Sequence, residues 1–132
     1  MRISSSKIIY ADSCYKLNGI FYKVHNELGR FCKEKQYADA IESLFKKYNI
    51  IYQRELDVPV KIEQNNITKN RVDFLVDNKI LVEIKAKKFI ERQDYYQTKR
   101  YLESIKLKLG LIVNFHERFL RPKRIINSLA KE

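Results

Sequence analysis

Residues 71–85 read RVDFLVDNKILVEIK, two apolar-rich runs with a period of two on either side of the polar triplet DNK. A period of two is typical of β-strands, and a short polar connection between two such runs predicts a β-hairpin. If DNK forms a three-residue loop, Val76 pairs with Ile80. Three residues further from the loop on each strand, Asp73 then pairs with Glu83. The sequence therefore predicts two opposed carboxylates on one face of a hairpin.

Opposed residues on antiparallel strands have Cβ atoms about 4.5–5.5 Å apart, so two ionised carboxylates at such a pair repel each other. A cation relieves this repulsion, and oxygen ligands suit Mg²⁺ or Mn²⁺. Lys85 lies two residues after Glu83 and therefore on the same strand face. Its ammonium group can orient a metal-bound water or offset charge on a phosphate. This combination of residue types fits the hydrolysis of a phosphodiester.

The same spacing also occurs on a solvated strand face with mixed charges and one cross-strand salt bridge. The residues around Glu83 favour a buried strand instead, because Leu81, Val82 and Ile84 are all apolar. A charge within a buried strand requires a partner or a metal ion. We therefore retain the functional interpretation of the carboxylate pair.

The segments on either side of the hairpin predict an α/β (α+β) fold. Apolar residues recur at helical spacing in three segments, and Gly29 fits the end of the first of them. Pro59 places the strand before the hairpin at a sheet edge or at its own start. The expected elements are helices at 15–28, 33–48 and 91–107, strands at 50–63 and 110–115, a turn-rich loop at 65–70, and a basic tail at 118–132 that ends in a short helix. The order is ααβββαβ and then α, and residues 1–132 are expected to form a single domain.

The chain is strongly basic, with 27 Lys and Arg against 16 Asp and Glu and a formal net charge of +11. Such a surface attracts polyanions, of which nucleic acid is the most common in a cell. An anionic membrane surface is a competing partner, and an AT-rich genome also enriches lysine without any partner. Further basic residues cluster in the tail at Arg118, Arg121, Lys123 and Arg124.

The two cysteines, Cys14 and Cys32, lie far apart and have no zinc-ligand spacing around them. We expect both to be reduced thiols in a cytoplasmic protein. No apolar run approaches the roughly 20 residues that cross a bilayer, so no membrane span is expected. The N-terminal residues lack the apolar core of a signal peptide.

Several blocks of the sequence resemble one prokaryotic protein family. They are KLNGIFYKVHNELG (16–29), KEKQYADAI (33–41), VDFLV (72–76), VEIKA (82–86) and LKLGLIVNF (107–115). In this order they look like the successive blocks of the GxxExxY family, a branch of the PD-(D/E)xK nuclease superfamily, over residues 17–126. One feature departs from the family's motif, because Gly29 stands five residues before Glu34. The Glu-x-x-Tyr half, Glu34 and Tyr37, is intact.

The resemblance implies a restriction-endonuclease-like core, with a central mixed β-sheet flanked by helices. It implies that Asp73 and Glu83 are metal ligands and that Lys85 is the catalytic lysine. Glu34 resembles the helix-borne acid that completes the metal site, although a solvated glutamate between Lys33 and Lys35 is the alternative. The activity implied is a Mg²⁺- or Mn²⁺-dependent nuclease that hydrolyses phosphodiester bonds of DNA through metal-activated water.

Three further residues are secondary candidates. His25 lies on a largely apolar helix face, where a hydrogen-bonded core histidine is common, but some branches of the superfamily use a helix histidine as a metal ligand. Gln97 and Tyr101 are four residues apart and share one helix face. They resemble a Gln-x-x-x-Tyr motif that positions the DNA strand, and an ordinary amphipathic helix is the alternative.

Basic and aromatic residues near the predicted site are candidates for nucleic-acid binding. Interleaved tyrosines at 95, 96 and 101 are candidates for stacking on unpaired bases. The basic candidates are Lys87, Lys88, Lys99 and Arg100. A catalytically weak nucleic-acid-binding or partner-binding module on the same fold is the alternative function, and the chain length and the tyrosines also permit a homodimer.

Overall fold

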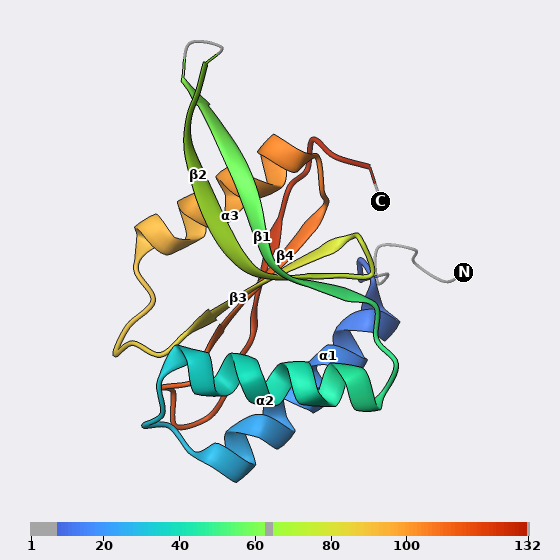
Figure 1. Ribbon diagram of the computed structural model, residues 1–132, viewed down its shortest axis with the longest axis vertical. Coiled ribbons are helices and arrows are strands. Elements are labelled where there is room, and N and C mark those ends of the chain that lie inside the picture. The colour runs from blue at the N-terminus through green and yellow to red at the C-terminus, as the bar shows by residue number, and fades with distance from the viewer. Residues whose placement is uncertain (1–7, 63–64, 132) are drawn as a thin grey trace, which may run out of the picture.

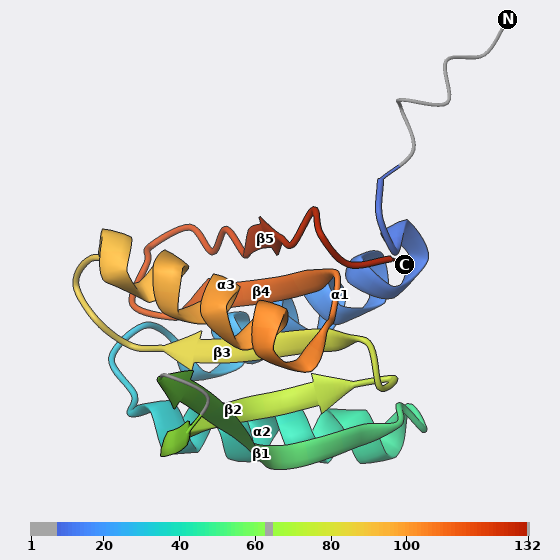
Figure 2. The same cartoon turned by 90° about the horizontal axis from the view of Figure 1, so that it is seen from above.

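A five-stranded mixed sheet with helices on both faces forms the framework of the computed structural model, which describes residues 8–62 and 65–131. The strands lie in the order β1-β2-β3-β4-β5, and only β3 and β4 are parallel among these neighbours. Helices α1 and α2 cover one face and α3 covers the other (Figures 1 and 2). The elements are α1 (Ala11–Leu28), α2 (Glu34–Lys47), β1 (Tyr52–Ile62), β2 (Asn65–Val76), β3 (Ile80–Lys85), α3 (Arg92–Ile105), β4 (Leu109–Asn114) and β5 (Lys123–Ile126). The predicted mixed sheet flanked by helices is confirmed.

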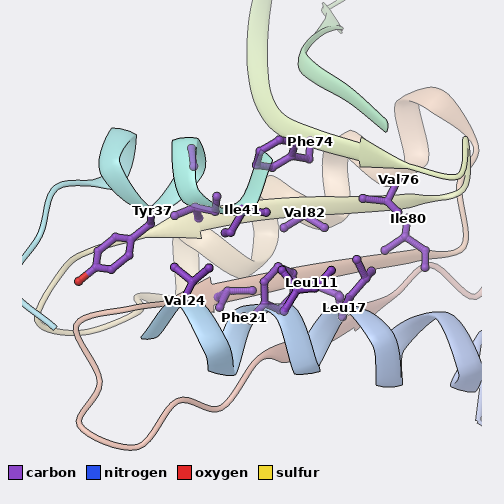
Figure 3. Close-up of a cluster of buried hydrophobic side chains, with 14 of the residues drawn as sticks. Leu17, Phe21, Val24, Tyr37, Ile41, Phe74, Val76, Ile80, Val82 and Leu111 are labelled. Carbon is purple, nitrogen blue, oxygen red and sulfur yellow. The ribbon is translucent and has the colours of Figure 1, made fainter. Parts of the chain in front are cut away.

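The larger core lies between the sheet and the α1–α2 pair. The period-two pattern of the hairpin supplies its sheet side, because Phe74, Val76, Ile80 and Val82 all point toward the helices. Figure 3 shows these side chains meeting apolar residues from both helices, among them Leu17, Phe21, Val24, Tyr37 and Ile41. Most of this core is fully removed from water, so the register of the hairpin is tightly specified.

The turn between β2 and β3 has the register that the sequence predicts. Val76 pairs with Ile80, and the N–H of Lys79 donates to the carbonyl of Val76 at 3.0 Å. Asp77 and Asn78 both have positive φ angles, 52° and 55°. Asp and Asn tolerate this left-handed conformation better than most residues, which explains why DNK closes the hairpin.

Helix α1 ends where the sequence indicates. Gly29 has φ 77°, and its N–H donates to the carbonyl of His25 at 2.9 Å. A side chain at this φ is strained, so glycine is the residue expected at such a helix end.

In the part of the chain that the structure describes, no helix combines the length and apolar character needed to cross a bilayer.

A smaller core lies under α3, and it includes one residue that the period-two pattern assigns to the opposite face. Val72 packs with Leu75 and Leu81 rather than with Phe74 and Val76. The strand β2 bends strongly near its middle (Figure 1), so the simple alternation of faces does not continue through the bend. A period of two predicts that residues 72, 74 and 76 share one face of the strand, and this prediction is wrong at position 72.

Two segments differ from the predicted elements. Residues 65–70 were expected to form a loop, but β2 begins at Asn65 and pairs with β1, with a register shift between Val60 and Lys61. This end of the β1–β2 hairpin projects beyond the helices (Figure 1), so backbone pairing maintains it without an apolar pattern. Strand β1 is an edge strand, as Pro59 indicated.

The tail forms a strand rather than a short helix. Residues 123–126 pair with β4, and no helix follows α3 within the described residues. The side chain of Asn127 then donates to the carbonyl of Leu107 at 3.1 Å, and its N–H donates to that of Lys108 at 2.8 Å. Strand β5 therefore forms the second outer edge of the sheet. Its sequence shows the period-two alternation of a strand over only a few residues.

Candidate active site

The pairing of β2 with β3 is short, and Asp73 and Glu83 lie where it ends. The last pair is Phe74 with Val82. Beyond it, the N–H of Ile84 donates to Oδ2 of Asp73 at 2.6 Å, and the N–H of Asp73 donates to Oε1 of Glu83 at 3.3 Å. Carboxylate oxygens thus replace strand carbonyls as acceptors. The structure brings the two acids together, each anchored to the backbone of the opposite strand.

The two acids also perturb each other electrostatically. Burial raises the pKa of Glu83 to about 7, and repulsion from Asp73 adds to this effect. Glu83 is only 5% exposed. The pKa of Asp73 is also raised, chiefly by burial and further by the charge of Glu34, while the charge of Lys85 opposes both increases. Ionising both acids therefore destabilises the folded chain unless a cation balances them.

Glu34 reaches this region from the first residue of α2. Its Oε2 accepts the N–H of Ala86 at 3.3 Å, across 52 residues of sequence. The contact places the N-terminus of α2 at the end of β3, although the side chain itself stays exposed. The charge of Glu34 raises the pKa of both Asp73 and Glu83. Three acids from three separate elements thus share one electrostatic site.

A cleft of about 550 Å³ lies beside Asp73 and is lined mainly by charged side chains of α2, β1 and β2. Arg54 spans it and donates to Asp39 at 2.8 Å and to Glu42 at 2.9 Å. The pKa of Glu42 is lowered by hydrogen bonds from Tyr52 and Arg54. Asp39 and Glu42 are therefore stabilised as anions by their partners, in contrast to the two acids with raised pKa.

Lys85 is held at the same site by a residue that the sequence analysis missed. Its Nζ lies 3.9 Å from Oδ1 of Asp94, whose Oδ2 accepts from Lys87 Nζ and from the N–H of Glu91, both at 2.8 Å. Burial opposes the ionisation of Asp94, but these donors and Lys85 hold its pKa below the ordinary value. Asp94 is the third residue of α3 and forms a capping box with Glu91. This spacing was the signal for Asp94 available in the sequence.

Asn114 is a second buried residue that sequence reasoning missed. Its Nδ2 donates to the carbonyl of Lys87 at 2.8 Å, and its Oδ1 accepts the N–H of Lys87 at 3.1 Å. Next to it, the N–H of Phe115 donates to the carbonyl of Lys85 at 2.9 Å. These bonds fix the chain directly after β3. The signal was a polar residue within the otherwise apolar run at 110–115.

A family model of the PD-(D/E)XK nuclease superfamily matches residues 11–126, nearly the whole chain. The chain belongs to this superfamily. The crystal structure of SSO0001 is similar, with a TM-score of 0.56 and 19% sequence identity over 70% of this chain and 49% of that chain. The present chain thus spans about half the length of that protein, and the likeness shows the fold alone. A comparison with curated proteins finds no significant match.

The restriction-endonuclease-like fold that the sequence predicts is thereby confirmed. Within residues 8–62 and 65–131, no three His, Cys, Asp or Glu side chains lie close enough to hold a metal ion by themselves. The donor set nevertheless fits a hard divalent ion. Mg²⁺ is usually bound by one or two carboxylates together with waters and substrate phosphates, and Asp73 and Glu83 supply two destabilised carboxylates.

Two of the secondary candidates, His25 and Tyr101, pack within the protein. His25 donates from Nε2 to the carbonyl of Glu117 at 2.8 Å, and its ring packs against Phe115. Tyr101 is only 3% exposed, and burial together with the charge of Glu83 raises its pKa to about 12. The buried ring of Tyr101 therefore offers no open face to a base.

The basic candidates lie on two elements. Lys87 and Lys88 lie in the loop after β3, where Lys87 forms ion pairs with Glu91 and Asp94, while Lys99 and Arg100 are exposed on α3. Gln97 is half-buried on α3, one helical turn before Tyr101.

Proposed function

We propose that this protein is a Mg²⁺- or Mn²⁺-dependent nuclease that hydrolyses phosphodiester bonds of DNA. The observation that carries the proposal is the meeting of the Asp73 and Glu83 carboxylates at the end of the β2–β3 pairing, with Lys85 on the same face of the sheet. Both acids have raised pKa values, so the site is built at a cost in stability that a bound cation offsets.

Asp73 and Glu83 would hold the metal ion, with Glu34 completing the negative charge of the site. A bound divalent ion supplies an activated water and compensates charge on the scissile phosphate. The backbone N–H groups that hold one oxygen of each acid leave the other oxygen of each for a cation. His25 stays a second-rank ligand candidate, because its Nε2 donates to the carbonyl of Glu117 and leaves Nδ1 for a metal ion.

Lys85 would stabilise the phosphate in the transition state. Its ammonium group lies 3.9 Å from Oδ1 of Asp94, and its charge lowers the pKa of both Asp73 and Glu83. An ammonium fixed in this way needs little reorganisation when charge develops on the phosphate. Lys87, Lys88, Lys99 and Arg100 would contact the DNA backbone.

Gln97 and Tyr101 would position the substrate strand from the α3 side, with Tyr101 acting through Glu83.

We further infer that the chain belongs to the GxxExxY branch of the superfamily. We also propose a cytoplasmic location, because Cys14 and Cys32 are both free thiols. Homodimerisation is a separate proposal, which light scattering tests.

Cleavage assays on plasmid and oligonucleotide DNA test the function. We expect cleavage with Mg²⁺ or Mn²⁺ and none in EDTA. Asp73→Asn, Glu83→Gln and Lys85→Met should each slow cleavage by about 100-fold or more. Glu103→Gln, on the exposed side of α3, is the matched control and should cleave at the wild-type rate. Unchanged cleavage by Asp73→Asn would end the proposal.

A catalytically weak nucleic-acid-binding module is the second candidate, and the net charge of +11 supports it equally. It predicts DNA binding in EDTA without cleavage under any divalent ion. Calorimetry with Mn²⁺ distinguishes the two: a nuclease site should bind the ion and lose that binding in Glu83→Gln, whereas a binding module need not bind it.

A further inference from the structure

Three phenylalanines project into solvent from three different loops. Phe31 is 80% exposed in the α1–α2 loop, Phe89 is 71% exposed in the β3–α3 loop, and Phe119 is 67% exposed in the β4–β5 loop. Large apolar side chains gathered on an exposed surface commonly mark an interaction site. We refer to these three residues as the phenylalanine platform.

The platform lies next to the candidate active site. The loop that carries Phe31 leads directly into Glu34, and the loop that carries Phe89 starts directly after Lys85. The third loop begins at Phe115, whose N–H donates to the carbonyl of Lys85 at 2.9 Å. Figures 1 and 2 both show the three loops on the same side of the molecule. All three therefore flank the place where the acids and Lys85 meet.

Contacts between the loops hold part of the platform in place. Arg30 donates from Nε to the carbonyl of His116 at 2.8 Å, and its guanidinium lies 5.1 Å from the centre of the Phe31 ring. The His116 ring meets Phe31 edge-on, with centres 5.8 Å apart. The guanidinium of Arg118 lies 5.3 Å from the centre of the Phe119 ring. The rings of Phe31 and Phe119 are thus paired with cationic groups while remaining open to solvent.

The same loops are rich in positive charge. They carry Arg30, Lys33, Lys87, Lys88, Arg118 and Arg121. Aromatic faces interleaved with basic side chains are the combination that binds unpaired nucleotides, since the bases stack on the rings and the phosphates contact the cations. A continuous duplex offers no free base faces, so it gains only from the charges.

We propose that the phenylalanine platform binds single-stranded nucleic acid by base stacking and directs an unpaired strand to the acids and Lys85. This inference deepens the proposed nuclease function and rests on it for the identity of the site. It assigns unpaired strands as the preferred substrate class, and it assigns the selection to Phe31, Phe89 and Phe119.

Binding in EDTA tests the platform without any cleavage. The probes are fluorescein-labelled dT20, the dT20·dA20 duplex and rU20, measured by fluorescence anisotropy. We expect wild-type protein to bind dT20 more tightly than the duplex. Phe31→Ala and Phe119→Ala should each weaken dT20 binding by about fivefold or more, and duplex binding by less than about twofold. Tyr15→Ala, which removes an aromatic ring that is 82% exposed on α1, is the control and should change neither.

A second pair of variants separates stacking from general hydrophobic contact. Phe31→Tyr keeps the aromatic face and should retain dT20 binding, whereas Phe31→Leu should lose it. Equal losses for duplex and single strand, or full binding by Phe31→Leu, would overturn the proposal. The rU20 arm reports whether the platform also accepts RNA, as stacking predicts. Because these measurements contain no metal, the cleavage assays on Asp73→Asn test the nuclease proposal independently of their result.

Discussion

At the scale of single residues, Glu83 shows how the site is balanced against stability. Its carboxyl group is held in a buried strand, and burial with repulsion from Asp73 raises its pKa to about 7, from an ordinary value of 4.5. Between these two pH values the folded chain binds a proton that the unfolded chain has released. The free energy of unfolding must therefore decrease as pH rises through this window.

This gives a direct test on the metal-free protein. Glu83→Gln removes the ionisable group and should raise the free energy of unfolding at pH 8 by up to about 3 kcal/mol relative to wild type. The difference should shrink as the pH falls through this window and level off below 4.5, where wild-type Glu83 becomes protonated in both states. Urea unfolding in EDTA at a series of pH values measures it. A constant difference across this range would contradict the assigned shift.

The same residues show what the sequence could predict of the site. Asp73 and Glu83 lie in one hairpin, and the turn residues fix its register, so their meeting followed from local pattern alone. Asp94 and Asn114 could not be placed in this way. Their roles depend on where the N-terminus of α3 and the end of β4 come to lie against β3, and only the folded chain defines that.

At the scale of elements, α3 is joined to the site through its first turn. Asp94 caps this end of the helix and faces both Lys85 and Lys87. Asp94→Asn keeps an oxygen for the N–H of Glu91 but removes the charge between two ammonium groups. We expect the free energy of unfolding to fall by about 1–2 kcal/mol and the cleavage rate to fall about tenfold or more.

Glu91→Gln is the control for this variant. Glu91 is exposed and forms an ion pair with Lys87 at 3.2 Å, so its loss should change stability by less than about 0.5 kcal/mol. The informative readout is the pH profile of the cleavage rate, which should shift for Asp94→Asn if the aspartate positions Lys85. If Asp94→Asn lowers stability but leaves the pH profile of cleavage unchanged, Asp94 acts only as a helix cap.

Two glycines test how closely the elements pack. A Cβ at Gly110 on β4 would lie 2.9 Å from Cγ2 of buried Thr98 on α3, and Thr side chains have little rotamer freedom in a helix. Gly110→Ala should therefore lower the free energy of unfolding by about 1–3 kcal/mol. At Gly19, within α1, a Cβ meets nothing within 4 Å, and Gly19→Ala should stabilise by about 0.5–1 kcal/mol. Denaturant unfolding of both variants checks the opposite signs.

The elements that the sequence predicted well were those with an apolar face to bury. The helices α1 and α2 and the strands β3 and β4 all contribute to the larger core, and their periodicity was visible. The start of β2 and the short strand β5 were missed. Residues 65–70 pair through the backbone in a projecting hairpin, and β5 completes a sheet edge with only four residues, so neither leaves a long pattern.

At the scale of the whole molecule, opposite charges are separated around the site. The chain carries a net charge of +11, yet the cleft beside Asp73 is lined by Glu34, Asp39, Glu42 and Glu55 as well. An acidic cleft in a basic protein attracts a polyanion to the surface and repels it at the centre unless cations are bound. Long-range attraction and metal binding should therefore depend on salt in different ways.

Nucleic-acid binding should weaken steeply with salt because each phosphate contact releases counterions. For single strands the logarithm of the affinity falls with the logarithm of salt concentration with a slope of about −0.7 per contacted phosphate. Arg118→Gln combined with Arg121→Gln should make the slope for dT20 shallower by about 1.4, because both residues lie in the β4–β5 loop beside the platform. Lys16→Gln combined with Lys46→Gln removes the same charge from α1 and α2, away from these loops, and should leave the slope unchanged. If both double variants change it equally, attraction is set by total charge, and the loops around the acids and Lys85 are not where the strand binds.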